Sequence, residues 1–401
     1  MYIKRILERD IRRYLDKREI IAVIGPRQSG KTTLLRQIFS ELKNAVFLDF
    51  EDRETLELFN DDIKSFIDLY VKKHDYLFID EFQYAKDGGK QLKYIYDSQN
   101  IKILISGSSA TSLSIQSIKY LVGRIFVFYL YPFSFEEYLN YKEPKLYSIY
   151  LKRKPTKPII ERIIPYFNEF CVFGGYPRVI LAKDNEEKET VLKNIYNTYF
   201  LKEIKEILNI PDDHRLSKLI HALALQIGNI INYNELSSIT GFNYKELLNY
   251  MNVLEKTFIS RKSQPFHTNK RTELVKSPKI FFIDNGFRNV VIKNFMAVGM
   301  RTDKGMLYEN FIATELIKKN VDIKYWRTKS KAEVDFVIES KGRIIPLEIK
   351  SELNRAKFTP SFISFIEKYK PKKALIFSEK LMADKNNVRF RPIFSLSKEL
   401  S

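Results

Sequence analysis

Short apolar runs alternate with amphipathic stretches over the first third of the chain. Four runs rich in Val, Ile, Leu and Phe are expected to be buried strands: residues 20–24, 45–50, 76–81 and 101–106. Helical patterns separate them, as in residues 33–39, where apolar side chains recur at positions 34, 35, 38 and 39. Strands that alternate with helices form a parallel sheet covered on both faces. We therefore predict an α/β core, preceded by an amphipathic helix over residues 3–18.

The middle of the chain is patterned mainly as helices. Residues 139–212 contain helical patterns joined by Lys-rich connectors, and they are expected to form a helical lid. Residues 213–275 show a helix, a short helix that Asn234 can cap, a turn at Gly241 and a second helix over residues 244–254. This order predicts a winged helix-turn-helix. Its wing is expected to open at residues 258–262 and to continue through Lys270 and Arg271.

The winged helix offers few polar contacts for reading bases. The expected contact residues are Lys245, Asn249, Asn252 and Lys256. Contacts to phosphates give affinity without sequence information, so the module is expected to grip DNA mainly through its wing. Two alternatives are a lid and a protein contact.

The last part of the chain, residues 276–401, predicts a second α/β domain. A helix begins at residue 304, and strands are expected over residues 323–327, 332–338, 344–350 and 374–377. With residues 1–138 as the α/β core, the chain would contain four parts.

Composition narrows the classes of function. The chain has 401 residues, is 44% hydrophobic and carries a formal charge of +19, spread along its length. This excess predicts a polyanionic partner, nucleic acid first and an anionic membrane second, although a Lys-rich surface is the alternative. Cys171 is the one cysteine, so no disulfide framework is expected and a cytoplasmic location is favoured. No apolar run is long enough to span a membrane.

One stretch matches the phosphate-binding pattern G-x-x-x-x-G-K-[ST] between a strand and a helix. In this loop, backbone N–H groups and the helix N-terminus face the phosphates of ATP. Lys31 is expected to reach the β and γ phosphates, and the Thr32 hydroxyl to hold Mg²⁺. The expected nucleotide-binding residues are Gly25, Arg27, Gln28, Ser29, Gly30, Lys31, Thr32 and Thr33.

Two further strand ends complete the expected hydrolytic centre. Asp80 and Glu81 follow an apolar run, and ligands of such sheets bind at the carboxyl ends of strands. Asp80 is expected in the Mg²⁺ shell, and Glu81 is expected to orient or deprotonate the attacking water. The next strand ends in Ser and Gly residues, among which Ser108 is the first choice for sensing the γ phosphate and Ser109 the second. A plain Ser/Gly turn is the alternative.

These residues resemble a known family. The segments 25–33, 78–81 and 106–109, followed by 121–124, 130–137 and 173–177, look like the AAA+-type ATPases of archaea and bacteria that carry a C-terminal nuclease-like domain. The resemblance implies an ATPase core, a helical lid and a homo-oligomer, with a hexamer as the family expectation. Arg124 is then either an arginine finger toward a neighbouring subunit or a structural arginine paired with an acidic residue. Arg178 is a weaker candidate for a lid arginine.

A second set of charged residues lies near the C-terminus. If the predicted strands pair, period two brings Asp335, Glu348 and Lys350 beside Glu309 of the preceding helix. Clustered carboxylates need a cation, and Mg²⁺ bound by Glu309, Asp335 and Glu348 would polarise a phosphodiester. Lys350 would position water or stabilise charge. Glu315 is the rival for the role of Glu309, and an ordinary hairpin with a solvated Glu348–Lys350 pair is the alternative to a site.

This pattern resembles the PD-(D/E)xK nuclease fold, which the family above also carries. All four expected positions are present, which favours an active, restriction-endonuclease-like domain. The sequence as a whole predicts an ATP-binding, ATP-hydrolysing AAA+-type protein that acts on DNA through a Mg²⁺-dependent nuclease domain. The alternative is an ATP-dependent switch, scaffold or DNA-binding regulator whose C-terminal domain does not cleave.

Overall fold

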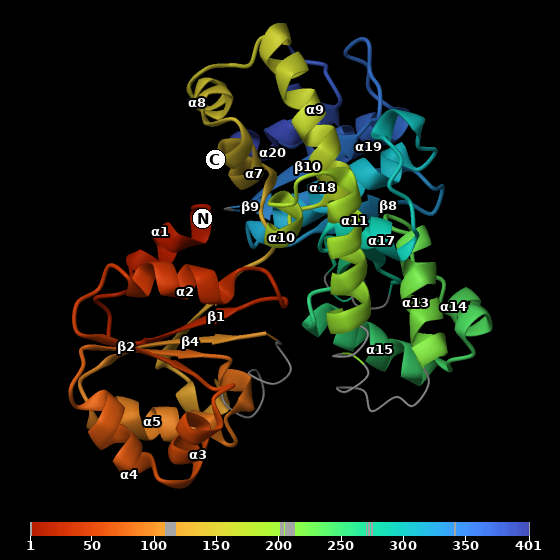
Figure 1. The fold of residues 1–401 in the computed structure, drawn as a ribbon. Helices are drawn as coiled ribbons and strands as arrows, with labels where there is room; N and C mark the ends of the chain where they lie inside the picture. Colours follow the sequence, from red (N-terminus) through yellow and green to blue (C-terminus); the bar gives the residue numbers. More distant parts are fainter. Residues whose placement is uncertain are drawn as a thin grey trace. The chain divides into compact units, whose positions relative to one another are not determined.

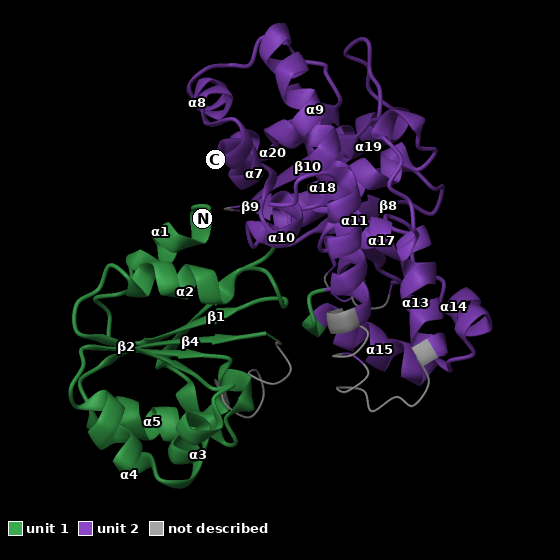
Figure 2. Ribbon diagram, in the orientation of Figure 1, with its two compact units in different colours: residues 1–132, 256–258 green, residues 133–255, 259–401 purple. Residues whose placement is uncertain are grey.

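The computed structural model describes residues 2–108, 118–200, 204, 213–269, 271, 273, 276–340 and 342–400 (Figure 1). They form two compact units (Figure 2). The first contains residues 1–132 and 256–258, and the second contains residues 133–255 and 259–401.

The first unit is built on a five-stranded sheet in which every pair of neighbouring strands is parallel. The strand order is β2-β3-β4-β1-β5, with bounds β1 Ile20–Ile24, β2 Ala45–Asp49, β3 Tyr76–Asp80, β4 Lys102–Gly107 and β5 Ile125–Tyr129. The predicted parallel α/β core is therefore confirmed, and all four predicted strands are present. Every residue of β1 is buried, as expected for a central strand between two helical layers.

Helices cover both faces of this sheet (Figure 1). One apolar cluster packs α1 Ile6–Arg12 and α2 Lys31–Phe39 against one face. Another packs the other face with α3 Arg53–Asp61, α4 Ile63–Phe66, the π-helix η1 Ile67–Val71 and α5 Gly88–Ser98. Short 3₁₀ turns lie at Phe82–Tyr84 and Ile118–Leu121. The first helix is shorter than predicted: the backbone at Arg5 is extended, with φ of −98° and ψ of 142°, and residues 13–16 form turns.

The second unit combines helices with a mixed eight-stranded sheet of order β12-β13-β11-β10-β9-β8-β6-β7. Parallel pairs are β6–β8, β10–β11 and β11–β13, and the other neighbours are antiparallel. The strands are β6 Ser260–Pro265, β7 Lys279–Phe282, β8 Lys324–Arg327, β9 Glu333–Ser340, β10 Arg343–Ile349, β11 Ala374–Ser378, β12 Ala383–Lys385 and β13 Val388–Pro392. The strands predicted for the C-terminal part are all present.

The helices of this unit fall into three stretches along the chain. The first is α7 Phe135–Lys142, α8 Pro144–Lys152, α9 Lys157–Phe173, α10 Pro177–Ile180, α11 Asn185–Asn194 and the π-helix Ile195–Phe200. The second is α13 Asp213–Leu225, α14 Tyr233–Thr240 and α15 Tyr244–Lys256. The third is α17 Asn285–Val291, α18 Lys304–Lys318, α19 Pro360–Tyr369 and α20 Leu396–Leu400, with 3₁₀ turns at Val298–Met300 and Ile393–Ser395.

The region predicted to be a winged helix has its three helices in the expected order. The cap of α14 is Asn232, and the prediction of Asn234 was wrong: the Asn232 side chain accepts N–H bonds from residues 234 and 235, so the helix starts earlier. Gly241 ends α14 with φ of 71°, as a turn glycine should. Lys245, Asn249 and Asn252 are exposed on α15.

The strands at the position of the wing belong to the larger sheet. β6 pairs with β7 on one side and with β8 on the other. The predicted boundary between residues 275 and 276 therefore separates two neighbouring strands of one sheet. Lys270 lies outside the described residues.

Two glycine-containing segments meet in the second unit with no room for side chains. A Cβ on Gly175 would lie 2.2 Å from the carbonyl oxygen of Phe133, and one on Gly286 would lie 2.0 Å from that of Phe173. Asp284 joins the two segments, because its carboxylate accepts the N–H groups of Gly175 at 2.7 Å and Phe287 at 3.0 Å. Burial raises the pKa of Asp284. The Phe-Gly-Gly-Tyr-Pro segment thus has a structural role in this unit.

Gly175→Ala should destabilise the second unit by about 1–3 kcal/mol, because the added methyl group overlaps backbone that must move. Gly305→Ala is the matched control, since a Cβ there meets no atom within 4 Å. Chemical denaturation of both variants measures the difference. Equal unfolding midpoints for the two variants would show that the backbone around Gly175 adjusts to a methyl group at little cost in stability.

Candidate functional site

The phosphate loop joins the end of β1 to the start of α2. Gly30 takes φ of 95°, a left-handed conformation that suits glycine, and α2 begins at the next residue, Lys31. A Cβ on Gly25 would lie 2.1 Å from the carbonyl oxygen of Leu130, so the loop passes directly against the backbone after β5. Lys31 is buried, and its Nζ donates to the carbonyl oxygens of Gly25 at 3.1 Å and Pro26 at 3.0 Å. The ammonium group therefore lies within the curve of the loop.

The remaining predicted loop residues differ in exposure. Ser29 is buried, Arg27 and Thr32 are half-buried, and Gln28 and Thr33 are exposed. Gln28 has φ of 60°, an uncommon conformation for a residue with a side chain. The local curvature therefore depends on two left-handed positions, Gln28 and Gly30.

Arg5 fixes the phosphate loop from outside the motif. Its Nη1 donates to the carbonyl oxygen of Ser29 at 2.9 Å, and its Nη2 donates to that of Tyr131 at 2.7 Å. The side chain is 6% exposed, so these bonds are largely shielded from water. The role of Arg5 was not predicted, because a basic residue before an amphipathic helix carries no signal of a contact so far along the chain.

Asp80 lies at the carboxyl end of β3, as predicted, and is buried. Its Oδ1 accepts hydrogen bonds from the Ser106 hydroxyl of β4 and from the N–H of Glu81 at 3.2 Å. Asp80 and Thr32 supply a carboxylate and a hydroxyl oxygen, the donor types that Mg²⁺ prefers. The chemistry of this pair fits the predicted Mg²⁺ site.

Glu81 is held by a neighbour that the sequence analysis also missed. Gln83 donates from Nε2 to Glu81 Oε2 and accepts the N–H of Ser108 at 3.2 Å through Oε1. Gln83 thus joins Glu81 to Ser108, the residue predicted to sense the γ phosphate. Glu81 has φ of 51°, and strained backbone of this kind is common at functional sites. Ser109 lies outside the described residues.

Arg124 lies at the amino ends of the parallel strands, at the end of the sheet opposite the phosphate loop. Its carbonyl oxygen accepts the N–H of Ile20 at 2.8 Å, at the amino end of β1, whereas the phosphate loop follows the carboxyl end. The guanidinium pairs with Asp97 at 3.0 and 3.4 Å. Arg124 therefore has the acidic partner of the structural alternative, and its sheet position separates it from the loop of its own chain. Arg178, in the second unit, is exposed and pairs with Glu187 at 3.5 Å.

The predicted C-terminal carboxylates lie on paired strands. The register of β9 and β10 aligns Phe336 with Leu347, so the next position sets Asp335 opposite Glu348. Asp335 Oδ2 accepts the N–H of Ile349 at 2.7 Å. Glu348 pairs with Lys350 at 2.8 Å and accepts the Thr359 hydroxyl at 2.9 and 3.0 Å. The predicted pairing of strands and the Glu348–Lys350 contact are both present.

Glu309 on α18 lies in the same cluster. A Cβ on Gly228 would lie 2.8 Å from Glu309 Oε2, so the carboxyl group packs against bare backbone there. Burial and the nearby Asp335 raise the pKa of Glu309 to about 8. Its rival Glu315 has another role: it pairs with Lys318 at 3.0 Å and accepts the N–H of Phe135 at 3.2 Å, at the start of α7.

Lys279 is the member of this cluster that the sequence analysis missed. It lies on β7, is 2% exposed and pairs with Glu333 at 2.5 Å. Burial alone would lower its pKa, but Glu309, Asp335 and Glu333 raise it instead. The cluster therefore contains a buried ammonium group in addition to Lys350.

The chemistry of the carboxylates suits Mg²⁺, but their placement does not gather them around one point. Among the residues that the structure describes, no three carboxylate, histidine or cysteine side chains stand close enough to share a metal ion. Lys279 and Lys350 supply positive charge where the sequence analysis expected a metal. The metal role of Glu309, Asp335 and Glu348 stays a prediction.

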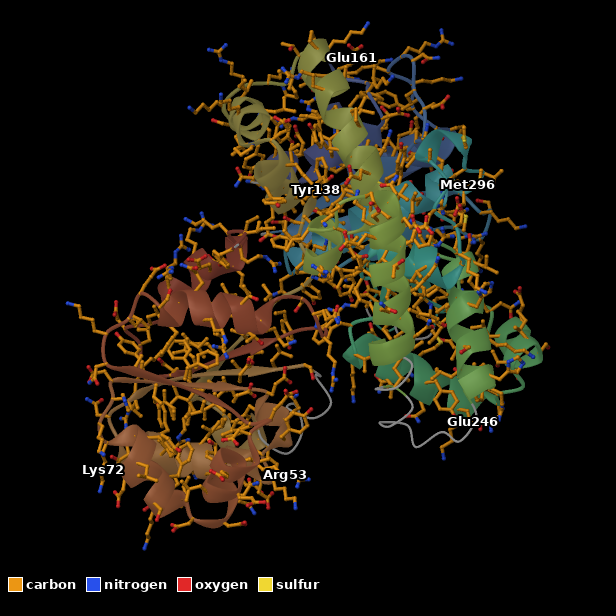
Figure 3. The ribbon with its side chains drawn as sticks, viewed as in Figure 1. Arg53, Lys72, Tyr138, Glu161, Glu246 and Met296 are labelled. Carbon is orange, nitrogen blue, oxygen red and sulfur yellow. The ribbon has the colours of Figure 1, made fainter. Side chains whose placement is uncertain are left out.

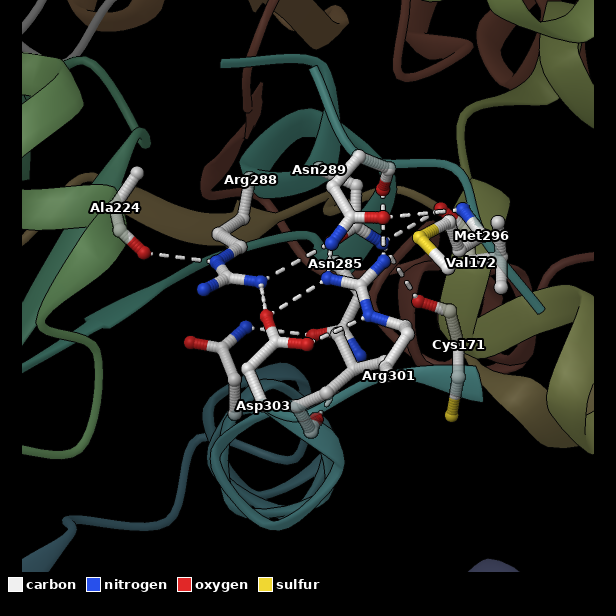
Figure 4. A network of polar contacts seen from close by, with 12 residues as sticks. Cys171, Val172, Ala224, Asn285, Arg288, Asn289, Met296, Arg301 and Asp303 are labelled. Carbon is white, nitrogen blue, oxygen red and sulfur yellow. Dashed lines mark hydrogen bonds and ion pairs between the residues drawn. The ribbon is translucent and has the colours of Figure 1, made fainter. Parts of the chain in front are cut away.

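A buried polar network supports the start of α18 (Figure 4). Asp303 precedes the helix and bonds to Arg288 at 2.5 Å and to Arg301 at 2.8 Å through each oxygen. Asn289 accepts from Arg301 at 3.0 Å and donates to the carbonyl oxygens of Cys171 and Val172 on α9. The network thus ties α9 and α17 to the helix that carries Glu309.

Comparisons with known proteins agree with the nucleotide-binding fold predicted for the first unit. Residues 17–139 match a family model described as "AAA domain". Residues 164–297 and 304–393 match models described as domains of unknown function, DUF8612 and DUF4143. The chain therefore carries an AAA-type P-loop domain that binds ATP. The two other matches name no activity.

Relatives of similar length match most of the chain at low identity. An uncharacterized protein of Haemophilus influenzae is 27% identical, with 83% of each chain covered. One of Methanocaldococcus jannaschii is 26% identical, covering 87% of this chain and 78% of its own. A Walker-type ATPase structure from Pyrococcus abyssi is 17% identical, covers 72% of this chain and 96% of its own, and has a TM-score of 0.48, too low to support a conclusion. No helix in the described part of the chain could cross a membrane.

Asp303→Asn should destabilise the second unit by about 3–5 kcal/mol, because it leaves two buried guanidinium groups without their shared carboxylate. Arg288 and Arg301 have side chains that are 1% and 0% exposed. Asp322→Asn, at an exposed position, is the control. Denaturant unfolding at pH 7 measures both, and a loss below about 1 kcal/mol would exclude this role for Asp303.

The same variant has a defined pH dependence. Burial opposes ionisation, but hydrogen bonds from Arg301 and Arg288 outweigh it and lower the pKa of Asp303 to about 2. The unfolded chain takes up this proton near pH 4. The contribution of Asp303 to stability is therefore complete above about pH 4 and is lost as the pH falls toward 2, a decline that Asp303→Asn should lack.

Proposed function

We propose that the chain hydrolyses ATP and uses this reaction to act on DNA. The observation that carries the proposal is the link from Glu81 through Gln83 to Ser108, beside Asp80, at the carboxyl edge of the sheet that holds the phosphate loop. An ATPase needs a residue that orients the attacking water close to the phosphates. Side chains position both carboxylates here, Ser106 that of Asp80 and Gln83 that of Glu81. Asp80 is proposed for Mg²⁺, so Glu81 is the carboxylate proposed for the water.

Each residue of the site has a proposed task. Lys31 exchanges its bonds to loop carbonyls for bonds to the β and γ phosphates, and the loop N–H groups hold the same phosphates. Thr32 and Asp80 would hold Mg²⁺, which offsets phosphate charge when bound. Glu81 orients the attacking water and accepts its proton. Ser108 reports the γ phosphate to Glu81 through Gln83.

Lys31→Ala should lose nucleotide binding, and Glu81→Gln should bind ATP but hydrolyse it at least about 100-fold more slowly. Glu57→Gln, at an exposed site of α3, is the matched control. Fluorescent-nucleotide titration and phosphate release measure the two steps. Normal turnover by Glu81→Gln would remove Glu81 from its proposed role.

DNA is the proposed partner because the formal charge is +19 and α15 leaves Lys245, Asn249 and Asn252 exposed. A homo-oligomer, with a hexamer as the expectation from the family resemblance, is proposed as the active form. Arg124 stands at the edge opposite its own phosphate loop, so it would serve the nucleotide of a neighbouring copy only after release from Asp97. A cytoplasmic location belongs to the same proposal.

The finer proposal is that the C-terminal cluster cleaves phosphodiester bonds with Mg²⁺. It is supported by Asp335 opposite Glu348, by Lys350 beside Glu348 and by the desolvated carboxyl group of Glu309. These residue types recur in metal-dependent phosphodiester cleavage, where oxygens hold the ion and an ammonium group stabilises charge. A second candidate, a DNA-gripping module that does not cut, is favoured by Lys279, whose buried charge already offsets the carboxylates.

The full chain should cleave DNA in the presence of Mg²⁺ or Mn²⁺, and Asp335→Asn should reduce the rate at least about 100-fold by removing a charged ligand. Asp322→Asn is again the control. Gel assays on single- and double-stranded DNA measure cleavage. Equal cutting by wild type and Asp335→Asn would exclude this site, and no cutting by wild type with either ion would support the non-cleaving candidate.

A further inference from the structure

Two adjoining cavities form a groove in the second unit, and eight of the twenty residues that line it are basic. They measure about 420 and 720 Å³ and share Lys154, Pro155 and Met382. We call them together the basic groove. Its walls come from the end of α8, the α8–α9 connector and the start of α9 on one side, and from the residues around β12, β13 and α20 on the other.

The charges of the groove do not balance. The α8–α9 side contributes Lys152, Arg153, Lys154 and Lys157, and the opposite side contributes Lys380, Arg389, Arg391 and Lys398. Three acidic side chains face these eight basic ones: Glu161, Asp384 and Glu399. Glu161 lies on α9 (Figure 3). The groove therefore carries a clear excess of positive charge.

Two of the three carboxylates are each shared between cations. Asp384 pairs with Lys154 at 3.2 Å and with Arg391 at 2.7 Å. Glu399 pairs with Arg389 at 3.0 Å and with Arg391 at 2.8 Å. In the described part of the chain, Lys152, Arg153 and Lys380 have no carboxylate within 4 Å, and all three are exposed. These groups are available to an anion from outside.

The walls of the groove are held in place by hydrogen bonds. Lys398 of α20 donates to the carbonyl oxygens of Tyr150 at 2.7 Å and Arg153 at 2.6 Å. The connector after α8 is thereby bound to the end of the chain, although nearly 250 positions separate them in sequence. These bonds hold the backbone of the two walls together.

We propose that the basic groove binds the phosphate backbone of double-stranded DNA. The inference rests on the proposed action on DNA and names the surface that makes the contact. No aromatic side chain lines the groove among the described residues, so the stacking platform that retains single strands is missing. Lysine and arginine side chains without base-reading partners contact phosphates independently of sequence.

The groove extends to the carboxyl ends of β10 and β11, in the sheet that carries the acidic cluster. Leu353 and Asn354 line it just after β10, and Lys380 and Leu381 line it just after β11. β10 and β11 are parallel neighbours, so their carboxyl ends share one edge, where Lys350 also lies. A duplex in the groove would pass the edge that holds Lys350 and Glu348.

The test compares two triple variants of the full chain with equal loss of charge. Lys152→Gln, Lys157→Gln and Lys380→Gln remove basic side chains of the groove. Lys368→Gln, Lys370→Gln and Lys372→Gln remove exposed lysines at the end of α19 and just beyond it. Fluorescence anisotropy with a short labelled duplex, over a series of salt concentrations, measures affinity and its salt slope. Thermal unfolding confirms that both variants are folded.

The groove variant should lower the salt slope by about 2–3, because each lost phosphate contact removes about 0.9, while the α19 variant should stay near wild type. Equal losses in the two variants would overturn the groove and leave DNA binding intact. Wild type that binds no duplex at low salt would overturn the proposed action on DNA as well. Equal loss with a single strand, or displacement of duplex by poly-glutamate at equal charge, would overturn the duplex assignment.

Discussion

Parallel strand pairing is the constraint on which the nucleotide site depends. It brings the carboxyl ends of β1, β3 and β4 to one edge, where the phosphate loop, Asp80 and Ser108 can meet. The Asp80–Ser106 bond and the Gln83 bridge then fix side chains that the strands have already brought close. Parallel pairing also places Arg124 at the opposite end of the sheet, beside the amino end of β1. One topological fact thus separates the residues proposed for the nucleotide of this chain from Arg124, whose guanidinium pairs with Asp97.

In the second unit, the compensation of buried charge governs the arrangement. Asp303 is paired with two arginines, and Lys279 pairs with Glu333 while the charges of Glu309 and Asp335 also raise its pKa. Removing charge from water is costly unless an opposite charge or hydrogen bonds replace the hydration. Charged side chains of the protein itself therefore stabilise the start of α18 and the acidic cluster that contains Glu309 and Asp335. Any cation that enters from outside must compete with Lys279 for the same carboxylates.

The sequence predicted the features whose signals are local. The phosphate loop, the apolar strands and the Asp80–Glu81 pair are each readable within a few residues, and the structure has the corresponding elements. Arg5, Gln83 and Lys279 could not be found in this way, because each acts on a group brought near only by tertiary folding. The sequence could not decide between Glu309 and Glu315 as the member of the acidic cluster. The two residues are six positions apart on a helix and therefore lie on different faces, but the sequence does not say which face meets β9.

The position of β6 affects how this protein can be divided for expression. β6 precedes residue 276, yet it lies between β7 and β8 in the eight-stranded sheet. A recombinant fragment that starts at residue 276 would keep both neighbours and lose the strand that joins them. The backbone groups freed on β7 and β8 would form new open edges, and such edges pair readily with other chains. Aggregation of that fragment would therefore reflect the cut and not the intrinsic solubility of the C-terminal region, and a fragment that retains β6 is the better choice.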